Sequence, residues 1–220
     1  YASIPSVLHS NTIANFVKYY YMEQNYPNKQ VHIVTRLDKD TSGLMLFAKH
    51  GYAHARLDKQ LQSKTIEKRY YALVSGQGEL EDEGEIIAPI ARDEDSIITR
   101  RVHPSGKYAH TSYRVVERFG DVALVDIRLH TGRTHQIRVH FAYIGYGLVG
   151  DPVYMPRVRV PAGASELLND TLRGFRRQAL HAVQLGLVHP RTGKDMMFEA
   201  PWSEDFATLV DVLRSENAAY

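Results

Sequence analysis

The sequence predicts an α+β fold, in which a mostly antiparallel mixed β-sheet with flanking helices and loops surrounds a central cleft. Two observations predict this class. Segments with apolar or alternating β-type patterns outnumber amphipathic helical segments, and the two kinds do not alternate as they do in βαβ units. The 220 residues contain no internal repeat and no low-complexity linker, so we expect residues 1–220 to form a single domain.

The first third of the chain is predicted to contain two helices and three strands. A helix over Thr12–Tyr21 is entered through Asn11, and a short amphipathic helix follows over Tyr52–Leu61. The apolar face expected of the first helix consists of Ile13, Phe16, Val17 and Tyr20. The strands are predicted from apolar or alternating runs at Val31–Val34, Leu44–Ala48 and Ile66–Val74.

The rest of the chain is predicted to be richer in strands. A protruding hairpin of acidic residues and glycines is expected near Glu79–Ile87, and proline and glycine make Pro152–Gly163 a loop. Two antiparallel pairs of strands are predicted, Ser112–Phe119 with Val122–Leu129 and Ala179–Val188 with Asp195–Glu199. The last two helices are predicted at Thr134–Tyr143 and Glu204–Arg214.

Composition excludes several classes of protein. The chain has no cysteine, which excludes disulfides, thiolate zinc sites and a cysteine nucleophile, and fits the reducing cytoplasm in which we expect the protein to act. No apolar run approaches the roughly 18 to 20 residues that span a bilayer, so no membrane partner is expected. The patterns G-x-x-x-x-G-K-[ST], G-x-G-x-x-G and G-x-S-x-G are absent, which leaves nucleotide-binding and serine-hydrolase interpretations without support.

The net charge of +2 is small, but the basic residues are unevenly distributed. One group comprises Arg100, Arg101, Lys107, Arg114 and Arg118, and a second comprises Arg157, Arg159, Arg173, Arg176 and Arg177. Such local patches can contact a phosphate backbone although the whole molecule would attract a polyanion only weakly. They are equally compatible with an ordinary solvated surface of mixed charge.

A charged segment, Thr35–Gly43, lies between two of the predicted strands and contains Arg36 and Asp38. A loop that leaves a buried strand can hold one carboxylate rigidly at the edge of a cleft, where an acid, base or nucleophile is useful. The Asp-Thr-Ser-Gly turn also has an ordinary interpretation, in which side-chain oxygens cap backbone amides. Within the segment, Asp40 competes with Asp38 for a catalytic role.

A second informative segment, Leu129–His140, runs from a glycine turn into a predicted helix. Arg133 and Arg138 would add guanidinium groups to a helix N-terminus, which already favours anions. Ile137 would place an apolar wall beside the Arg138 cation. The alternative is an ordinary surface helix start, since basic residues are common wherever a helix is exposed.

Three histidines near this segment, His130, His135 and His140, invite a metal interpretation. Their five-residue spacing places successive side chains about 140° apart around a helix and fits no common ligand pattern. Arginines lie among them and would oppose a dication. We therefore expect structural histidines and no metal.

A third segment, Glu67–Gly76, carries the adjacent tyrosines Tyr70 and Tyr71. In a strand, one must face the core and the other the opposite side of the sheet, and Tyr70 would share its face with Ala72 and Val74. Tyrosine in a strand usually serves packing. The functional alternative is an aromatic plate on which a base stacks.

Taken together, these segments resemble the pseudouridine synthases of the RluA-type branch. Members carry R-L-D-x-x-T-S-G, K-x-Y-x-A-x-V-x-G and G-R-[ST]-H-Q-[IL]-R-x-H segments, a G-D pair, and L-H-A and H-P-x-T-G pieces. The matching positions, in family order, are Arg36–Gly43, Lys68–Gly76, Gly132–His140, Gly150-Asp151, Leu180–Ala182 and His189–Gly193. Each match alone would be weak, whereas the ordered set covers about residues 3 to 213.

The resemblance implies an enzyme that isomerises specific uridines in structured RNA, ribosomal or transfer RNA, to pseudouridine without a cofactor or a metal. The catalytic residues it implies are Asp38, Tyr70 and Arg138, and the substrate-binding residues are Arg36, Ile137 and Arg133. Asp38 would attack C1′ or remove a 2′ proton, with Arg138 as its charge partner. Tyr70 would stack on the uracil.

The remaining implied roles concern the flipped base and the RNA backbone. Ile137 would close the second face of the uracil, Arg36 would fill the space that the flipped base leaves, and Arg133 would contact phosphate. A non-catalytic RNA-binding domain on the same scaffold is the main alternative. A hydrolase that uses Asp38 and Asp40 as a carboxylate pair is another, although two residues apart in a turn they have no reason to flank a sugar.

The sequence departs from the family pattern at two positions and at its start. Thr35 stands where many members have histidine, and Gly147 stands where proline is common before Gly-Asp. The lysine-proline segment expected before Ser3 is absent, as is the S4-type RNA-binding domain that many members carry. We therefore expect a truncated N-terminus. We also expect the protein to act as a monomer.

Overall fold

The computed structural model describes residues 11–94, 96, 98–157, 160 and 163–217. Within these residues, the largest sheet has eight strands, and its main path runs β12-β11-β4-β9-β8-β5. The strands of this path are β4 Glu67–Gly76, β5 Glu83–Ile87, β8 His110–Phe119, β9 Val122–Leu129, β11 Leu180–Val188 and β12 Asp195–Glu199. All neighbours on the path are antiparallel.

Two short strands lie off that path and make the sheet mixed. The strand β10 (Tyr146–Leu148) is antiparallel to the end of β4, and β2 (Ser42–Gly43) is parallel to β11. The α+β class and the mostly antiparallel mixed sheet are thus confirmed. Two-residue strands β1 (His32–Ile33) and β3 (Phe47–Ala48) pair with each other beside the sheet.

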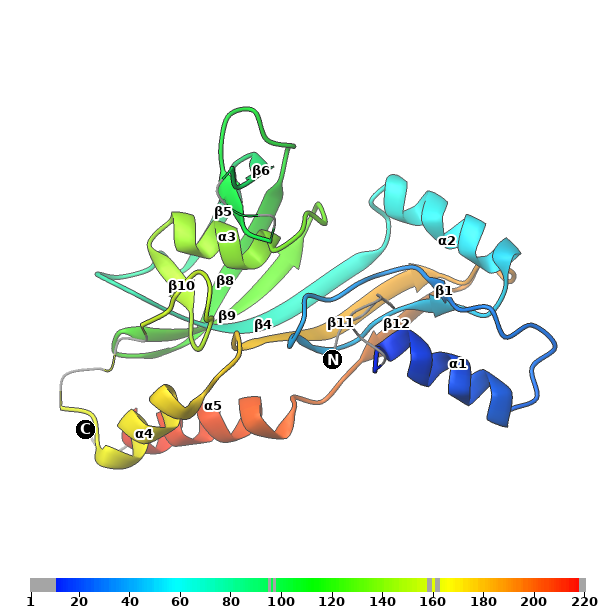
Figure 1. The fold of residues 1–220 in the computed structure, drawn as a ribbon. Helices are drawn as coiled ribbons and strands as arrows, with labels where there is room; N and C mark the ends of the chain where they lie inside the picture. Colours follow the sequence, from blue (N-terminus) through cyan, green and yellow to red (C-terminus); the bar gives the residue numbers. More distant parts are fainter. Residues whose placement is uncertain (1–10, 95, 97, 158–159, 161–162, 218–220) are drawn as a thin grey trace.

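Helices cover both faces of the sheet (Figure 1). The helices α4 (Glu166–Gly174) and α5 (Glu204–Asn217) pack on one face, where Leu172 and Phe206 are fully buried with Leu73 of β4. The helix α3 (Gln136–Tyr143) packs on the opposite face against the Tyr70 side of β4. Burial of both sheet faces explains why β4 is almost continuously apolar from residue 70 onward.

The other two helices belong to the N-terminal part of the chain. The helix α2 (Gly51–Gln62) buries Leu57 against Leu185 and Leu187 of β11. The helix α1 (Ile13–Glu23) begins at an N-cap, Thr12, whose hydroxyl accepts a hydrogen bond from the Asn15 amide at 3.3 Å. The segment that contains Asp38 follows β1 and leads into β2, which pairs with β11.

Most predicted elements are confirmed within a few residues, including both antiparallel pairs and the four predicted helices that match α1, α2, α3 and α5. Three details are wrong. The cap of α1 is Thr12 and not Asn11, and Ala14 and Tyr21 form its buried side, whereas Phe16 and Tyr20 are half exposed. The α1 helix packs through a small residue and one tyrosine, so its larger apolar side chains lie outward.

The third wrong detail concerns the acidic region near β5. Glu83–Ile87 pairs with β8 as an edge strand and does not form a hairpin of its own. The protruding hairpin is formed instead by β6 (Ile90–Arg92) and β7 (Arg100–Val102), at the top of Figure 1. The predicted loop Pro152–Gly163 lies partly outside the described residues, and residues 1–10 lie entirely outside them.

Candidate active site

The segment that carries Asp38 is a tight turn followed by a strand that joins the main sheet. The Thr41 amide donates a hydrogen bond to the Asp38 carbonyl at 3.1 Å, and Asp40 has a left-handed backbone with φ of 67°. Gly43 (φ 105°) then approaches β11 so closely that a Cβ atom would lie 2.2 Å from the Ala182 carbonyl oxygen. Only glycine fits there, which explains the polar Ser-Gly ending of the segment.

The same turn is held from outside by residues that precede β11. The Gln178 amide group donates to the Lys39 carbonyl at 2.6 Å and to the Thr41 hydroxyl at 2.8 Å. Arg177 donates through Nη1 to the Asp40 carbonyl at 3.1 Å. These bonds fix the backbone on both sides of Asp40, so the turn interpretation of this part of the segment is correct.

A cleft of about 900 Å³ opens beside this turn. It is lined by the segment around Asp38, by β4 and by the glycine turn that precedes α3. Five of the six predicted site residues line it: Arg36, Asp38, Tyr70, Arg133 and Ile137. The structure therefore brings together side chains from three segments that are far apart in the sequence.

The sixth predicted residue, Arg138, lies behind the cleft and is almost fully buried. Its Nη1 atom is 3.7 Å from Oδ2 of Asp38, whose side chain is 23% exposed. Its other nitrogens form two hydrogen bonds with the fully buried Asp151, from Nε to Oδ2 at 2.7 Å and from Nη2 to Oδ1 at 2.9 Å. Arg138 thus lies between two carboxylates, and the one facing the cleft is Asp38.

Asp151 is itself held firmly, and its charge is stabilised. Its Oδ1 atom accepts hydrogen bonds from the backbone amides of Val153 at 2.9 Å and Tyr154 at 3.0 Å. Burial alone would raise the pKa of Asp151, but the Arg138 guanidinium and these amides outweigh burial and lower it. A buried carboxylate that remains charged is a rigid anchor for the arginine.

Tyr154 completes the support of the arginine from a third side. The Arg138 guanidinium lies over the Tyr154 ring at 5.0 Å from its centroid, within the range of cation–π contacts. The Tyr154 hydroxyl accepts a hydrogen bond from the Arg100 amide at 2.8 Å and lies 2.9 Å from Nδ1 of His135. His135 has φ of 57°, so the entry to α3 is a left-handed turn.

Tyr70 and Ile137 form an apolar wall of the cleft. Both are buried and belong to one hydrophobic cluster, which Leu37 joins from the Asp38 segment. Burial raises the pKa of Tyr70, and the nearby negative charge of Asp38 raises it further. Tyr71 faces the opposite side of the sheet, where its ring packs edge-on against Trp202 with the ring centroids 5.5 Å apart. The prediction that the two tyrosines face opposite sides of the sheet is therefore confirmed.

The two predicted substrate arginines lie at the rim. Arg36 is exposed and lines the cleft directly before Leu37 and Asp38. Arg133 is also exposed, but its Nε atom donates to the Tyr108 carbonyl at 2.9 Å, which orients the side chain. Two exposed cations at the mouth of a cleft with an apolar wall suit a ligand that has both a flat ring and a phosphate.

Sequence reasoning missed three residues of this region. Asp151 was noticed only as part of a Gly-Asp pair, and Tyr154 was not considered. Lys68, which precedes Tyr70 by two residues, also lines the cleft, and burial lowers the pKa of its ammonium group. The role of Asp151 has no local signal in the sequence, because it depends on burial and on pairing with Arg138.

The histidines of this region have different surroundings. His140 is fully buried, with Nδ1 2.9 Å from the Thr111 hydroxyl and Nε2 3.0 Å from the Ala88 carbonyl, so it is structural as predicted. His135 contacts Tyr154, and His130 follows β9.

Among the described residues, no helix is both long and apolar enough to cross a membrane.

Fold, turn and cleft agree with one class of protein. The chain belongs to the RNA pseudouridylate synthase family, because the sequence model of that family matches residues 2–143. The resemblance noticed in the sequence is thereby confirmed. Among solved structures, Human RNA Pseudouridylate Synthase Domain Containing 4 superposes with a TM-score of 0.75 over 97% of this chain and 87% of its own, at 22% identity, which supports the shared fold.

Curated relatives include two bacterial proteins named Ribosomal large subunit pseudouridine synthase D. The Pseudomonas aeruginosa protein is 49% identical over 188 residues, which are 86% of this chain and 58% of the relative. The Escherichia coli K12 protein is 47% identical over 184 residues, 84% of this chain and 56% of the relative. The chain therefore spans a little more than half the length of these relatives.

Proposed function

We propose that this chain isomerises uridine in RNA to pseudouridine, with Asp38 as the reacting carboxylate. The observation that carries the proposal is the placement of Asp38. It is a partly exposed carboxylate at a cleft with an aromatic wall, 3.7 Å from a buried arginine that is anchored by a second carboxylate. Family membership supports the same reaction.

The reaction exchanges one bond of the sugar for another. The bond between N1 of uracil and C1′ breaks, the detached ring turns, and C5 bonds to C1′. C5 then loses its proton to solvent, and N1 gains one. No electrons are gained or lost overall, so one carboxylate near the sugar and a pocket that retains the ring are the groups the chain must supply.

Asp38 has two possible roles, attack on C1′ or removal of a 2′ proton, and both require its ionised form. Arg138 supplies the compensating charge. At an effective dielectric near 20, unit charges about 4 Å apart attract by roughly 4 kcal/mol before desolvation costs. Asp151 and Tyr154 hold the guanidinium, so Arg138 acts as a fixed charge behind Asp38 and not as a mobile surface cation.

Retention of the uracil falls to the apolar wall. We propose that Tyr70 stacks on the ring, which is worth about 1–3 kcal/mol per base, and that Ile137 closes the other face. A paired uridine must first leave its stack at a cost of a few kcal/mol. The exposed Arg36 at the rim is placed to fill the vacated space, and Arg133 to contact a phosphate.

The substrate class follows from the relatives. The Pseudomonas aeruginosa and Escherichia coli K12 relatives are named for the large ribosomal subunit, and on that ground we propose that this chain acts on ribosomal RNA of that subunit. Transfer RNA is the alternative. We further propose that residues 1–220 work as one catalytic domain, as a monomer, in the cytoplasm.

The test is a product assay on large-subunit ribosomal RNA that contains 5-tritiated uridine. The account predicts release of tritium to water and pseudouridine in the RNA digest. Binding of the RNA without tritium release would support the non-catalytic RNA-binding alternative. Free uracil in the supernatant would instead identify a hydrolase, because hydrolysis leaves the C5 position unchanged. Release with transfer RNA alone would reassign the substrate.

A further inference from the structure

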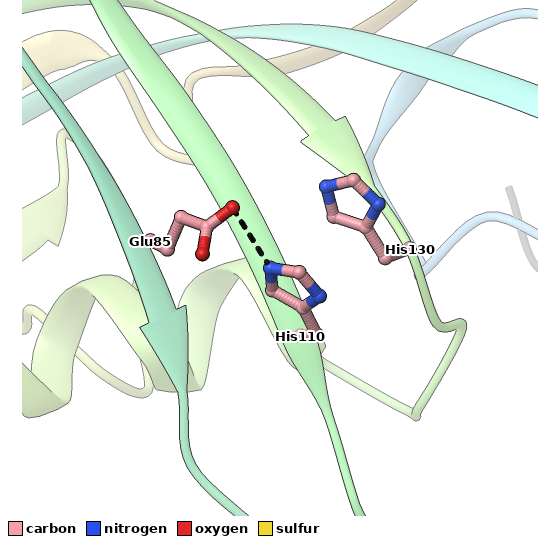
Figure 2. Close-up of side chains that lie close together, drawn as sticks. All are labelled: Glu85, His110 and His130. Atoms are coloured by element: carbon pink, nitrogen blue, oxygen red, sulfur yellow. Dashed lines mark ion pairs between the residues drawn. The ribbon is translucent and has the colours of Figure 1, made fainter.

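Three potential metal ligands lie in a row across the edge of the sheet, away from the apolar wall of the cleft. Glu85 of β5, His110 of β8 and His130 after β9 come from three neighbouring strands, and each offers a ligand atom within 4.8 Å of the others. Figure 2 shows these side chains together on the sheet. The row is set by register, because Glu85 pairs with Ser112 and the His130 amide donates to the His110 carbonyl at 3.2 Å.

The ring of His110 has an unused nitrogen in this row. Its Nε2 atom is buried and has no hydrogen bond with any described residue, although Oε1 of Glu85 lies 3.4 Å away. A buried nitrogen without a hydrogen bond is uncommon, and the 3.4 Å approach of the Glu85 carboxylate compensates it only in part. The dashed line in Figure 2 marks the approach of Glu85 to this nitrogen.

The second imidazole is held by a neighbour and stacked on the first. The Nε2 atom of His130 lies 2.9 Å from the Ser112 hydroxyl, and Ser112 pairs with Glu85, so Nε2 is the nitrogen on the Glu85 side. The two rings are nearly parallel, with centroids 4.0 Å apart, so one ring must turn for both to bind one ion. An ion bound by Nε2 would take the place of the hydroxyl contact.

We propose that Glu85, His110 and His130 bind a divalent transition-metal ion such as Zn²⁺. Two imidazoles and one carboxylate are the ligand types that suit zinc, whereas Mg²⁺ and Ca²⁺ prefer oxygen ligands alone. This differs from the expectation that the protein binds no metal. That expectation rested on the family resemblance and on the helical spacing of His130, His135 and His140, whereas the ligands here are brought together by strand pairing.

The surroundings of the row are compatible with a cation. Two basic side chains, Arg128 and Lys64, lie near His130, and Arg128 is partly charge-compensated by Glu67 at 3.5 Å. Glu85 itself is mostly exposed and able to adjust its rotamer toward an ion. Coordination would cross-link the edge strand β5 to β8 and to the residue that follows β9, which would hold β5 in place at the edge of the sheet.

The site is distinct from the proposed reaction centre. Ser112 and Glu85 line a groove of about 740 Å³ together with Arg69 and Asp126, whereas Tyr70, the next residue to Arg69, faces the cleft. Residues alternate between faces along a strand, so the groove and the apolar wall of the cleft occupy opposite sides of the sheet. His130 also lines a smaller pocket that shares Lys68 and Arg133 with the cleft, so tritium release is measured both with and without the ion.

The experiment is a calorimetric titration of the chelator-treated protein with Zn²⁺, repeated with Co²⁺ to record its visible absorption. The account predicts one ion per chain and a d–d spectrum of nitrogen and oxygen ligands, which is readable because the chain has no cysteine. His110→Gln and Glu85→Gln are each expected to weaken binding by at least about tenfold. Glu85 is exposed, so its variant keeps the fold even where a histidine variant does not.

His103→Gln is the matched control, because the Nδ1 atom of His103 contacts Ser105 in a surface turn, away from the Glu85 row. It is expected to bind as the unmodified protein does. Equal affinity in all variants, or several weak sites per chain, would overturn the proposal and identify adventitious binding to surface histidines. Absence of saturable binding would overturn it as well. Tritium release by the chelator-treated protein tests the proposed function separately.

Discussion

Two arginines hold the Asp38 segment, and they do so in different ways. Arg138 is 6% exposed, pairs with the fully buried Asp151, and directs its remaining nitrogen at the Asp38 side chain. Arg177 is 17% exposed, pairs with the half-exposed Asp205, and donates to the Asp40 carbonyl. The first arginine acts on the charge of the segment and the second on its backbone.

Similar ion pairs can differ in how much the loss of one partner affects stability and activity. A buried pair has lost its hydration, so removing one partner leaves an uncompensated charge in a low-dielectric interior. A pair at the surface is screened, and its loss is partly offset by water. We therefore expect changes at Arg138 to affect both chemistry and stability, and changes at Arg177 to affect mainly the order of the turn.

The largest difference is expected for Arg138→Gln. Glutamine cannot neutralise Asp151, so the free energy of unfolding should fall by about 3–5 kcal/mol. At a temperature at which the variant is folded, kcat for tritium release should still fall by about 10²–10³, because a fixed charge beside the reacting group is lost. Chemical denaturation and single-turnover kinetics measure the two effects. A stable variant with normal turnover would show that Arg138 neither stabilises the fold nor supports the reaction at Asp38.

Asp151→Asn separates the positioning of Arg138 from its charge. The amide can still accept one hydrogen bond from the guanidinium, but the carboxylate that anchors it in two places is lost. We expect a stability loss of about 1–3 kcal/mol and a lower kcat, with an unchanged KM for RNA, because Asp151 does not line the cleft. A rise in KM alone would show that Asp151 shapes RNA binding instead.

Arg177→Gln is the surface counterpart of the change at Arg138. The stability loss should be about 1–2 kcal/mol, because Asp205 is 49% exposed, whereas Arg177 is 17% exposed and also donates to the hydroxyls of Ser42 and Ser203. The turn keeps its bonds from Gln178, so kcat should fall only modestly. Hydrogen exchange of the Thr41 amide should increase. A loss of turnover as large as that of Arg138→Gln would mean that backbone order, and not charge, limits the reaction.

The smallest expected effect is the contribution of Asp205 to acid stability. Hydrogen bonds from Arg177 lower the pKa of Asp205 to about 2. A depressed carboxylate pKa contributes stability that is fully present above the unfolded value, about 3.9, and is lost as pH falls towards the folded value. Between pH 4 and about 2, Asp205→Asn should therefore show a shallower loss of unfolding free energy than the unmodified protein. Identical slopes would show that the pair is not maintained in solution.

The long strands and the turn after Asp38 could be predicted from sequence because their signals are local. Alternation placed Tyr70 and Tyr71 on opposite faces of β4, and the Asp-Thr-Ser-Gly segment identified a turn. Short elements were missed for a physical reason. The three-residue strands β6, β7 and β10 are too short to show a period, and β2 has a polar sequence because Gly43 must fit against β11.

The roles of residues that depend on partners far away in the sequence could not be predicted from the sequence. The outward side chains of α1 are apolar, so periodicity alone assigned Phe16 to the core. The helix α4 was missed although it is amphipathic and buries Leu168 and Leu172, because it is only nine residues long and follows a proline-rich loop. Asp151 could be recognised as an anchor only when its pairing with Arg138 was seen, and the Glu85–His110 approach only when the strands were in register.

The most direct test of the central claim compares Asp38→Asn with Asp40→Asn in the tritium-release assay. The two residues share one turn, but only Asp38 lies in the cleft beside Arg138. The account predicts that Asp38→Asn retains the fold and much of its RNA binding and releases no tritium above background, whereas Asp40→Asn retains most of its activity. Normal release by Asp38→Asn, or loss confined to Asp40→Asn, would contradict the assignment of Asp38 as the reacting carboxylate.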